Sequence, residues 1–255
     1  MGAVSLSTPC SLAVGCATAV LLAACSSPPP APLAPRSAPP RAPAGPHTAS
    51  LAAGGRSRAT LDVVTGATLL TIRAAALGAG GPLLRASTPA GDPPPLLRED
   101  DADGTSPAGE DPLVTLSAKN ASAVTVTLNA AVSWQLDLAG GTSRTVADLR
   151  GGQVAGISLT AGAGVIDLAL PRPRGRVPVQ LGAGASQFLL SLPGGVPVRV
   201  TAASGAGEVS LEGQDYSGVA GGSVFTTPGW APGATGLDID ALAGAGRIAV
   251  AARPS

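Results

Sequence analysis

The sequence has few of the side chains on which most enzymes and metal sites depend. Its three cysteines all lie within the first 25 residues, and its one histidine is His47. The rest of the chain therefore has no disulfide, no thiolate or imidazole metal ligand, and none of the usual general bases for a Ser or Cys nucleophile. We expect a protein without catalytic residues and without a cofactor.

An excess of charge of one sign is also absent, since 16 basic side chains balance 16 acidic ones. This balance excludes bulk electrostatic attraction to nucleic acid or to an anionic membrane surface. The chain contains only two Trp, one Tyr and two Phe, whereas Gly and Pro occur 35 and 25 times. With 45% hydrophobic residues it is nevertheless too apolar to be disordered throughout.

A hydrophobic run long enough to cross a membrane is missing from the N-terminal region. Residues Leu12 to Ala24 form a mostly apolar stretch of 13, whereas a spanning helix needs about 20. The stretch fits the apolar part of a signal peptide over residues 1–24. It ends in Leu22-Ala23-Ala24-Cys25, which resembles the bacterial lipobox, although no Lys or Arg precedes Cys25. The alternative is an ordinary secretory signal that is followed by a coincidental cysteine.

The lipobox resemblance implies that the Cys25 thiol carries a diacylglyceryl group with palmitate-like chains. Two chains anchor a protein stably, so the membrane itself is an expected partner, on its extracytoplasmic side. Residues 25–58 form the expected linker, with nine prolines between Ser26 and His47. The 22 residues from Ser26 to His47 favour polyproline II and span up to about 70 Å when extended. We expect His47 to be an exposed residue of this tether.

The remaining residues, 59–255, show short stretches in which apolar and polar residues alternate, as in Val124–Leu128 and Trp134–Leu138. Alternation of period two is typical of strands with one buried face. The pattern predicts an all-β domain without long helices. It also predicts burial of four apolar side chains from separate strands, namely Leu159, Val179, Val198 and Ile239.

Gly-Ala-Gly turns recur in this domain, beginning at Gly162, Gly182, Gly205 and Gly244, which are 20, 23 and 39 residues apart. A period near 20 favours the stacked rungs of a β-solenoid, or β-helix. The longest interval contains residues 214–234, which we expect to form one large loop. The alternative is an antiparallel sandwich with glycine-rich turns, which the prolines inside strands favour.

The alternating strands, the glycine turns and the final segment LDIDALAGAGRIAVAARP resemble the bacterial toastrack domains, which occur in adhesin-like and cell-wall-active antibiotics response proteins. The resemblance covers about residues 113–253, with Leu61–Ala74 as a possible first rung. It implies a right-handed β-helix on a membrane-anchored protein, and it brings no catalytic residues. The acidic stretch at about 87–111 departs from the pattern.

That acidic stretch holds the sharpest chemical pattern of the domain. Counted from Glu99, oxygen ligands fall at the spacing of an EF-hand loop, which makes a weak calcium candidate. Pro107 and the proline-rich flanks favour a hydrated, mobile insertion without metal, with nothing to pin it to the core. The candidate ligands are Glu99, Asp101, Asp103 and Glu110.

Two further groups of charged residues have a functional and a plain structural interpretation. Asp238 and Asp240 share one strand face at a separation of about 6–7 Å, near that of paired glycosidase carboxylates. Polar residues are also expected on the wet face of any strand. Arg172, Arg174 and Arg176 form a basic corner, which we expect to be a solvated turn and not an anion site.

The sequence thus predicts a lipid-anchored envelope protein at the cell membrane that displays a non-catalytic β-solenoid for binding or scaffolding. Its expected partner is an envelope protein or polysaccharide, and not nucleic acid. Two alternatives stay open. One is a carbohydrate-active enzyme on wall polysaccharide, and the other is an accessory to an envelope-stress signalling system.

Overall fold

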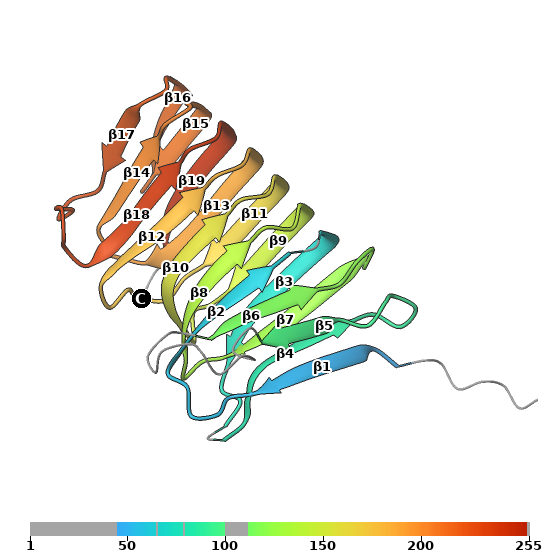
Figure 1. The fold of residues 1–255 in the computed structure, drawn as a ribbon. Helices are drawn as coiled ribbons and strands as arrows, with labels where there is room; N and C mark the ends of the chain where they lie inside the picture. The colour runs from blue at the N-terminus through green and yellow to red at the C-terminus, as the bar shows by residue number, and fades with distance from the viewer. Residues whose placement is uncertain (1–44, 65, 79, 100–111, 254–255) are drawn as a thin grey trace, which may run out of the picture. The chain divides into compact units, whose positions relative to one another are not determined.

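The computed structural model describes residues 45–64, 66–78, 80–99 and 112–253, which belong to one compact unit. These residues form nineteen β-strands and no helix (Figure 1). The part of the chain that the structure describes therefore offers no helix of the length and apolarity that a membrane crossing needs. The expected all-β class is confirmed for these residues.

The strands form two sheets, and most neighbours within each sheet run parallel. The first sheet has ten strands, in the spatial order β1 (His47–Ala52), β4 (Pro82–Thr88), β7 (Ala123–Asn129), β3 (Ala67–Ala75), β9 (Thr142–Asp148), β11 (Ala163–Ala169), β13 (Ala185–Pro193), β19 (Ala245–Arg253), β15 (Ala206–Leu211) and β16 (Gln214–Val219). The second has nine, in the order β17 (Ser223–Thr226), β14 (Val198–Ala202), β18 (Gly236–Ala241), β12 (Arg176–Leu181), β10 (Gln153–Leu159), β8 (Ser133–Leu138), β2 (Arg58–Val63), β6 (Leu113–Ser117) and β5 (Leu96–Glu99).

Fourteen of the strands form seven layers of two consecutive strands, one in each sheet, while β1, β4, β5, β16 and β17 belong to no layer. The layers are β2–β3, β6–β7, β8–β9, β10–β11, β12–β13, β14–β15 and β18–β19. The expected first rung, Leu61–Ala74, corresponds to the layer β2–β3. Since each layer shares its apolar interior with its neighbours, no layer buries a core alone.

The layers do not stack in the order of the sequence. The last layer, β18–β19, lies between β12–β13 and β14–β15 in both sheets (Figure 1). At the other end, β2–β3 lies between β6–β7 and β8–β9. A repeat near 20 residues predicts layers added one after another, and for these two layers that prediction is wrong. Each inserted layer makes parallel ladders on both of its sides.

Antiparallel strands close both ends of the two sheets. β1 pairs with β4, β4 with β7, and β5 with β6 at one end, while β16 pairs with β15 and β17 with β14 at the other. The expectation of one large loop over residues 214–234 is wrong, because β16 and β17 lie in it. Glu212 (φ 50°) and Gly213 (φ 83°) form the two-residue turn into β16, and positive φ at both positions is typical of a type I′ hairpin.

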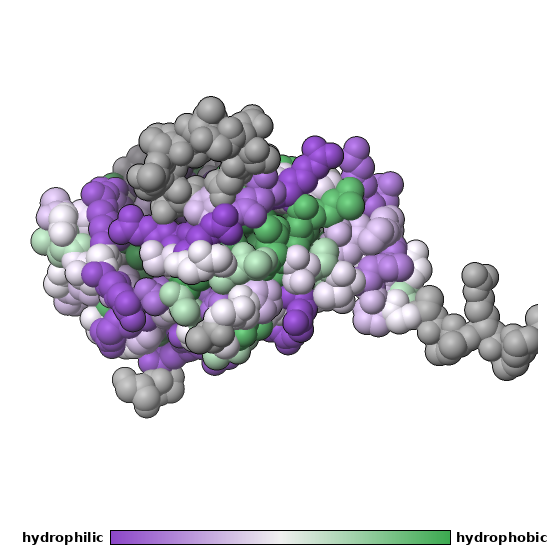
Figure 2. Space-filling model, turned by 60° about the horizontal axis from the view of Figure 1, so that its bottom comes forward, coloured by the Kyte–Doolittle hydropathy of each residue, from purple (hydrophilic) through white to green (hydrophobic). Residues whose placement is uncertain are grey.

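The structured unit begins earlier than the expected boundary at residue 59. His47 opens β1, pairs with Thr88 and is partly buried, so it is not a free residue of the tether. Figure 2 turns the end that carries β1 toward the viewer and shows an apolar stretch between hydrophilic ones. Three large apolar side chains are exposed in this part of the second sheet. They are Leu96 of β5, Leu113 of β6 and Val64, which directly follows β2.

The core lies between the two sheets and follows the alternation of the strands. Leu159, Val179, Val198 and Ile239 are each at most 2% exposed, as the alternation predicts. The two largest buried side chains are Trp134 and Phe188. The Trp134 indole N–H donates to the Asn129 carbonyl over 3.1 Å, so its polar group is satisfied inside the core.

Glycine is required where neighbouring layers approach at the start of the first-sheet strands. Parallel pairing places Ala163, Ala185, Ala245 and Ala206 in one row across β11, β13, β19 and β15. The next position is Gly164, Ser186, Gly246 or Gly207. A Cβ on Gly246 would lie 2.5 Å from the Ser186 carbonyl oxygen, so this position has no room for one. Three of the four Gly-Ala-Gly turns share this register, and the one at Gly182 is offset by two residues.

We expect the Gly246→Ala substitution to lower the free energy of unfolding by about 1–3 kcal/mol, because the new methyl group overpacks a carbonyl in the adjacent layer. Gly244→Ala is the matched control, since its Cβ would meet nothing nearer than the Gly205 oxygen at 3.9 Å. Urea unfolding of both variants measures the difference. Equal stability of the two variants would contradict the stacking of β19 against β13.

Candidate binding site

Four of the residues singled out for lipid or calcium lie outside the described residues, namely Cys25, Asp101, Asp103 and Glu110. Glu99, the remaining calcium candidate, ends β5 and forms an ion pair with Arg56. Its carboxylate is thus already next to a cation. Within the described ranges no group of three or more His, Cys, Asp or Glu side chains could hold a metal ion.

The first half of the acidic stretch is attached to the body, so the expectation that nothing pins it is wrong for residues 87–99. β5 pairs there with β6, and Pro95 and Thr88 are buried. The Asp92 carboxylate accepts hydrogen bonds from the Ser122 hydroxyl and amide, both at 2.7 Å. These bonds lower the pKa of Asp92 below its ordinary 3.8, with the Ser122 hydroxyl as the largest cause.

We expect Ser122→Ala to raise the Asp92 pKa part of the way back toward its ordinary value. The native pKa lies below the unfolded one, so the hydrogen bonds stabilise the fold above the unfolded pKa and lose this effect as the pH falls through the native pKa. A carboxyl ¹³C NMR titration measures the pKa, with Ser117→Ala as the control. An unchanged Asp92 pKa in Ser122→Ala would show that the hydroxyl does not hold the carboxylate.

A cluster of charged residues lies on the outer face of the second sheet, where β12, β18 and β14 are neighbours. Asp238 of β18 is only 2% exposed, and it forms ion pairs with Arg176 and with Arg199, the latter at 2.5 Å. Arg199 also reaches Asp240, at 3.5 Å. The carboxylates of Asp238 and Asp240 share one face, as the alternation predicts. Because Asp238 faces two guanidinium groups, it is not placed as a free acid or base.

An aromatic side chain completes this cluster. The Arg199 guanidinium lies 5.1 Å from the centroid of the Trp230 ring, in a cation–π contact. Such a contact contributes about 0.5–1 kcal/mol at exposed sites. Trp230 belongs to the connection between β17 and β18. Sequence analysis missed it, although a lone Trp among Gly and Pro residues was a visible signal.

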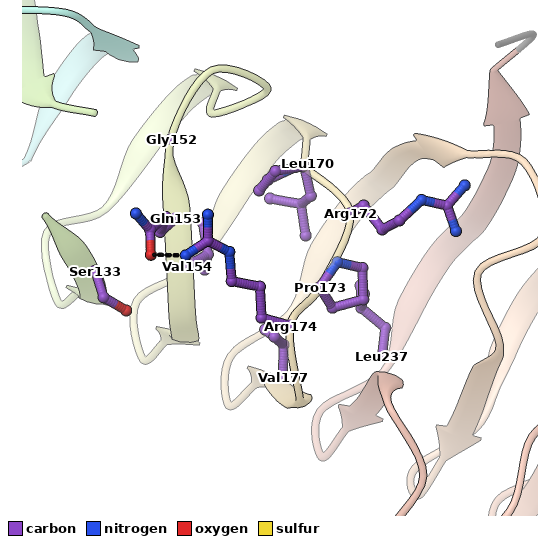
Figure 3. A pocket seen from close by; sticks show the side chains of 11 residues that line it. Ser133, Gly152, Gln153, Val154, Leu170, Arg172, Pro173, Arg174, Val177 and Leu237 are labelled. Atoms are coloured by element: carbon purple, nitrogen blue, oxygen red, sulfur yellow. Dashed lines mark hydrogen bonds between the residues drawn. The ribbon is translucent and has the colours of Figure 1, made fainter. Parts of the chain in front are cut away.

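A small pocket lies at the start of β10, β12 and β18, where the ladder between β10 and β12 is open. These strands pair only from Ile157–Val179 to Leu159–Leu181. Upstream, a β-bulge displaces β10 between Val154 and Gly156, opposite Pro178, which has no N–H to donate. The gap left at Gln153 and Val154 is the pocket, with a volume of about 60 Å³ (Figure 3).

The pocket has an apolar floor and a polar mouth. Leu170, Val177 and Leu237 line it and are each at most 5% exposed. The Arg174 guanidinium donates to the Gln153 side-chain oxygen over 3.0 Å across it (Figure 3). Ser133 and Arg172 also line it. The pocket therefore combines residues from the corner before β12 with residues of four strands, β8, β10, β12 and β18.

The three arginines of the predicted basic corner are all exposed, as expected, but they do not form one turn. Arg172 donates to the Gly194 carbonyl over 2.9 Å, and Arg174 to Gln153. Arg176 lies in β12 and pairs with Asp238. Two of them thus border the pocket and the third belongs to the charged cluster, so the three side chains do not converge on one anion position.

No family model matches the chain. No curated protein matches it either. Among solved structures it is similar to a protein from Clostridium sporogenes that is described as a "putative cell adhesion protein". The match covers 82% of this chain and 99% of the other, with 16% sequence identity and a TM-score of 0.58. At this identity the likeness shows the fold alone, an all-β body with parallel strands.

Proposed function

We propose that the chain is a lipid-anchored, non-catalytic binding protein of the bacterial envelope. Its body is a right-handed single-stranded β-solenoid of the toastrack type, displayed for adhesion or scaffolding. The layered parallel strands support the solenoid, because crossovers between parallel strands of one sheet are almost always right-handed. The description of the similar Clostridium sporogenes structure as a "putative cell adhesion protein" supports the adhesin-like role.

The observation that carries a binding role is the concentration of unlike side chains around the start of β12 and β18. Arg174 lines the pocket there, and Arg199 of β14, the strand next to β18, contacts Trp230, in a chain that contains only two Trp residues. Binding hot spots are enriched in Arg and Trp and form around well-packed pockets. We call the pocket together with Arg176, Arg199, Trp230 and Asp238 the sheet-edge site.

The same geometry favours binding over catalysis. A glycosidase needs one protonated and one ionised carboxyl group on either side of the scissile bond. Asp238 is buried between Arg176 and Arg199, which block access to it. A wall-polysaccharide enzyme would need a free acid there. The remaining alternative, an accessory to envelope-stress signalling, would use the same surface for a protein partner.

The lipid anchor and the tether give this proposal its location, the extracytoplasmic side of the cell membrane. The lipobox that ends at Cys25 would hold the chain in the membrane through two or more acyl chains. The nine prolines that follow would keep the body at a distance from the bilayer while allowing it to reach polysaccharide or protein. A display function needs reach and retention, and it needs no catalytic residue.

Co-sedimentation with isolated envelope material tests the proposed function. The purified full-length chain, kept in detergent, is mixed with insoluble cell-wall polysaccharide and with stripped envelope protein fractions. We expect saturable sedimentation with one of these fractions, and a clear reduction in an Arg199→Ala, Trp230→Ala double variant. A double variant on the outer face of the first sheet, Arg144→Ala and Val146→Ala, is the control. Absence of saturable binding to every fraction would contradict a binding role.

A further inference from the structure

The pocket in the sheet-edge site has the size of a small substituent. A cavity that holds one water molecule has a volume of about 10–15 Å³. On the same scale this pocket has a volume of about 60 Å³. It therefore accommodates a group of a few non-hydrogen atoms. Its floor of Leu170, Val177 and Leu237 offers water no hydrogen-bond partner from side chains. An apolar end of a ligand fits such a floor better than water does.

The mouth of the pocket sets the other half of the ligand's chemistry. The Arg174 guanidinium has five N–H donors and uses one on Gln153, so further donors remain for a ligand. The Gln153 amide and the Ser133 hydroxyl also line the pocket and add donors (Figure 3). The group that fits must combine an apolar tip with a hydrogen-bond acceptor directly behind it.

An acetamido group has this arrangement, with a methyl tip and a carbonyl oxygen one bond away. We propose that the pocket binds the acetamido group of an N-acetylated amino sugar in a polysaccharide. The methyl lies on Leu170, Val177 and Leu237, and the carbonyl oxygen accepts from Arg174. This inference rests on the proposed binding function and names the ligand class of the same site.

The surroundings favour a polysaccharide over an acetylated peptide. Parallel pairing places Gln153, Ser133 and Arg58 in one row across β10, β8 and β2. Neighbouring strands lie about 4.8 Å apart, so the row offers polar side chains at regular steps beside the pocket. Hydroxyl groups of successive sugar units can pair with such a row. A single acetyl-lysine side chain would reach only the two members of the row that line the pocket, Gln153 and Ser133, and would leave Arg58 unused.

Isothermal titration calorimetry with the full-length chain in detergent tests the proposal. The probe is a β-1,4-linked tetramer of N-acetylglucosamine, and the matched probe is the glucose tetramer, which has a hydroxyl in place of each acetamido group. We expect the glucose tetramer to bind about tenfold more weakly or worse. In saturation-transfer NMR the acetyl methyl protons should receive the strongest saturation from the protein.

Two substitutions locate the binding at the pocket. Ser133→Phe places a ring at the mouth, and we expect it to abolish binding of the N-acetylated tetramer. Its control is Ser158→Phe. Ser158 is half-buried like Ser133, but it lies on β10 of the same sheet and does not line the pocket. Arg174→Gln keeps most of the side-chain length and should weaken binding about fivefold. Arg144→Gln, on the first sheet, should have no effect. Thermal unfolding of each variant separates lost binding from lost fold.

Three results would overturn this inference. They are equal binding of the two tetramers, tighter binding of an acetyl-lysine peptide than of the N-acetylated tetramer, and unchanged binding in folded Arg174→Gln and Ser133→Phe. The proposed function fails separately, through absence of binding to every envelope fraction. If the chain sediments with envelope material but binds neither tetramer, the acetamido assignment is wrong and the proposed binding function is still supported.

Discussion

Replacement of Cys25 by Ala is expected to move the chain completely from the membrane fraction to the soluble fraction. The thiol is the atom to which the diacylglyceryl group would be joined, and the segment before it is too short to span a bilayer. The described residues contain no helix that could span a membrane, and the balanced charge gives no bulk attraction to anionic lipid. Cell fractionation after labelling with an alkyne fatty acid measures both location and lipid.

Cys10 and Cys16 provide the matched controls, because they lie in the same N-terminal segment. We expect Cys16→Ala to keep the label and the membrane location. Mass spectrometry of the N-terminal peptide should show a chain that begins at a modified Cys25. A chain that begins elsewhere, or a Cys25→Ala protein that still incorporates the fatty acid, would contradict the anchor.

Substitution of Phe188 by Ala is expected to lower the free energy of unfolding by about 3–5 kcal/mol. Phe188 is fully buried in β13 and pairs with Ile166 on one side and Ile248 on the other. Its loss leaves a cavity in three adjoining layers, since the rigid ladders around it prevent collapse. Such a loss is a large part of the stability of an ordinary domain.

Gln187→Ala is the control for this substitution, since Gln187 is the exposed neighbour in the same strand. We expect its effect to stay within about 0.5 kcal/mol. Urea unfolding followed by tryptophan fluorescence measures both variants, because Trp134 reports on the core. Similar stability losses for Phe188→Ala and Gln187→Ala would mean that β13 does not bury the face which its alternation indicates.

Alternation was enough to predict the all-β class and the buried faces of the strands that it marked. Leu159, Val179, Val198 and Ile239 were assigned to the core from period-two spacing alone, and all four are buried. Burial of this kind is a local property, because a shift of one residue would turn every apolar side chain toward water. The Glu212-Gly213 turn was missed, because Glu is not among the residues that usually precede Gly in a two-residue hairpin turn.

The order of the layers could not be predicted from the sequence. β18 and β14 carry similar alternating segments, and either could continue the stack beside β12. The choice depends on contacts between distant residues, such as Asp238 with Arg176 and Arg199. Pro178, a proline inside a strand, wrongly favoured the antiparallel sandwich, because its effect also depends on a distant strand. It lies in a central strand because the bulge in β10 removes the ladder at its position.

The pocket was invisible in the sequence because its lining comes from distant segments. Ser133, Gln153, Leu170 and Leu237 are ordinary residues where they stand in the chain, and only the inserted layer brings Leu237 to the floor. The basic residues Arg172 and Arg174 were the one local signal. Sequence analysis placed them in a solvated turn. Both side chains are indeed exposed, but their hydrogen bonds to Gly194 and Gln153 were not foreseen.

The claim that this chain binds envelope material through one defined surface, without chemistry, is tested most directly by hydrogen–deuterium exchange of the full-length protein with isolated cell-wall polysaccharide. We predict slower exchange for the backbone amides of residues 152–154, 172–177 and 236–238, and no release of soluble reducing sugar during the experiment. Protection confined to the outer face of the first sheet, or steady release of reducing sugar, would contradict the account.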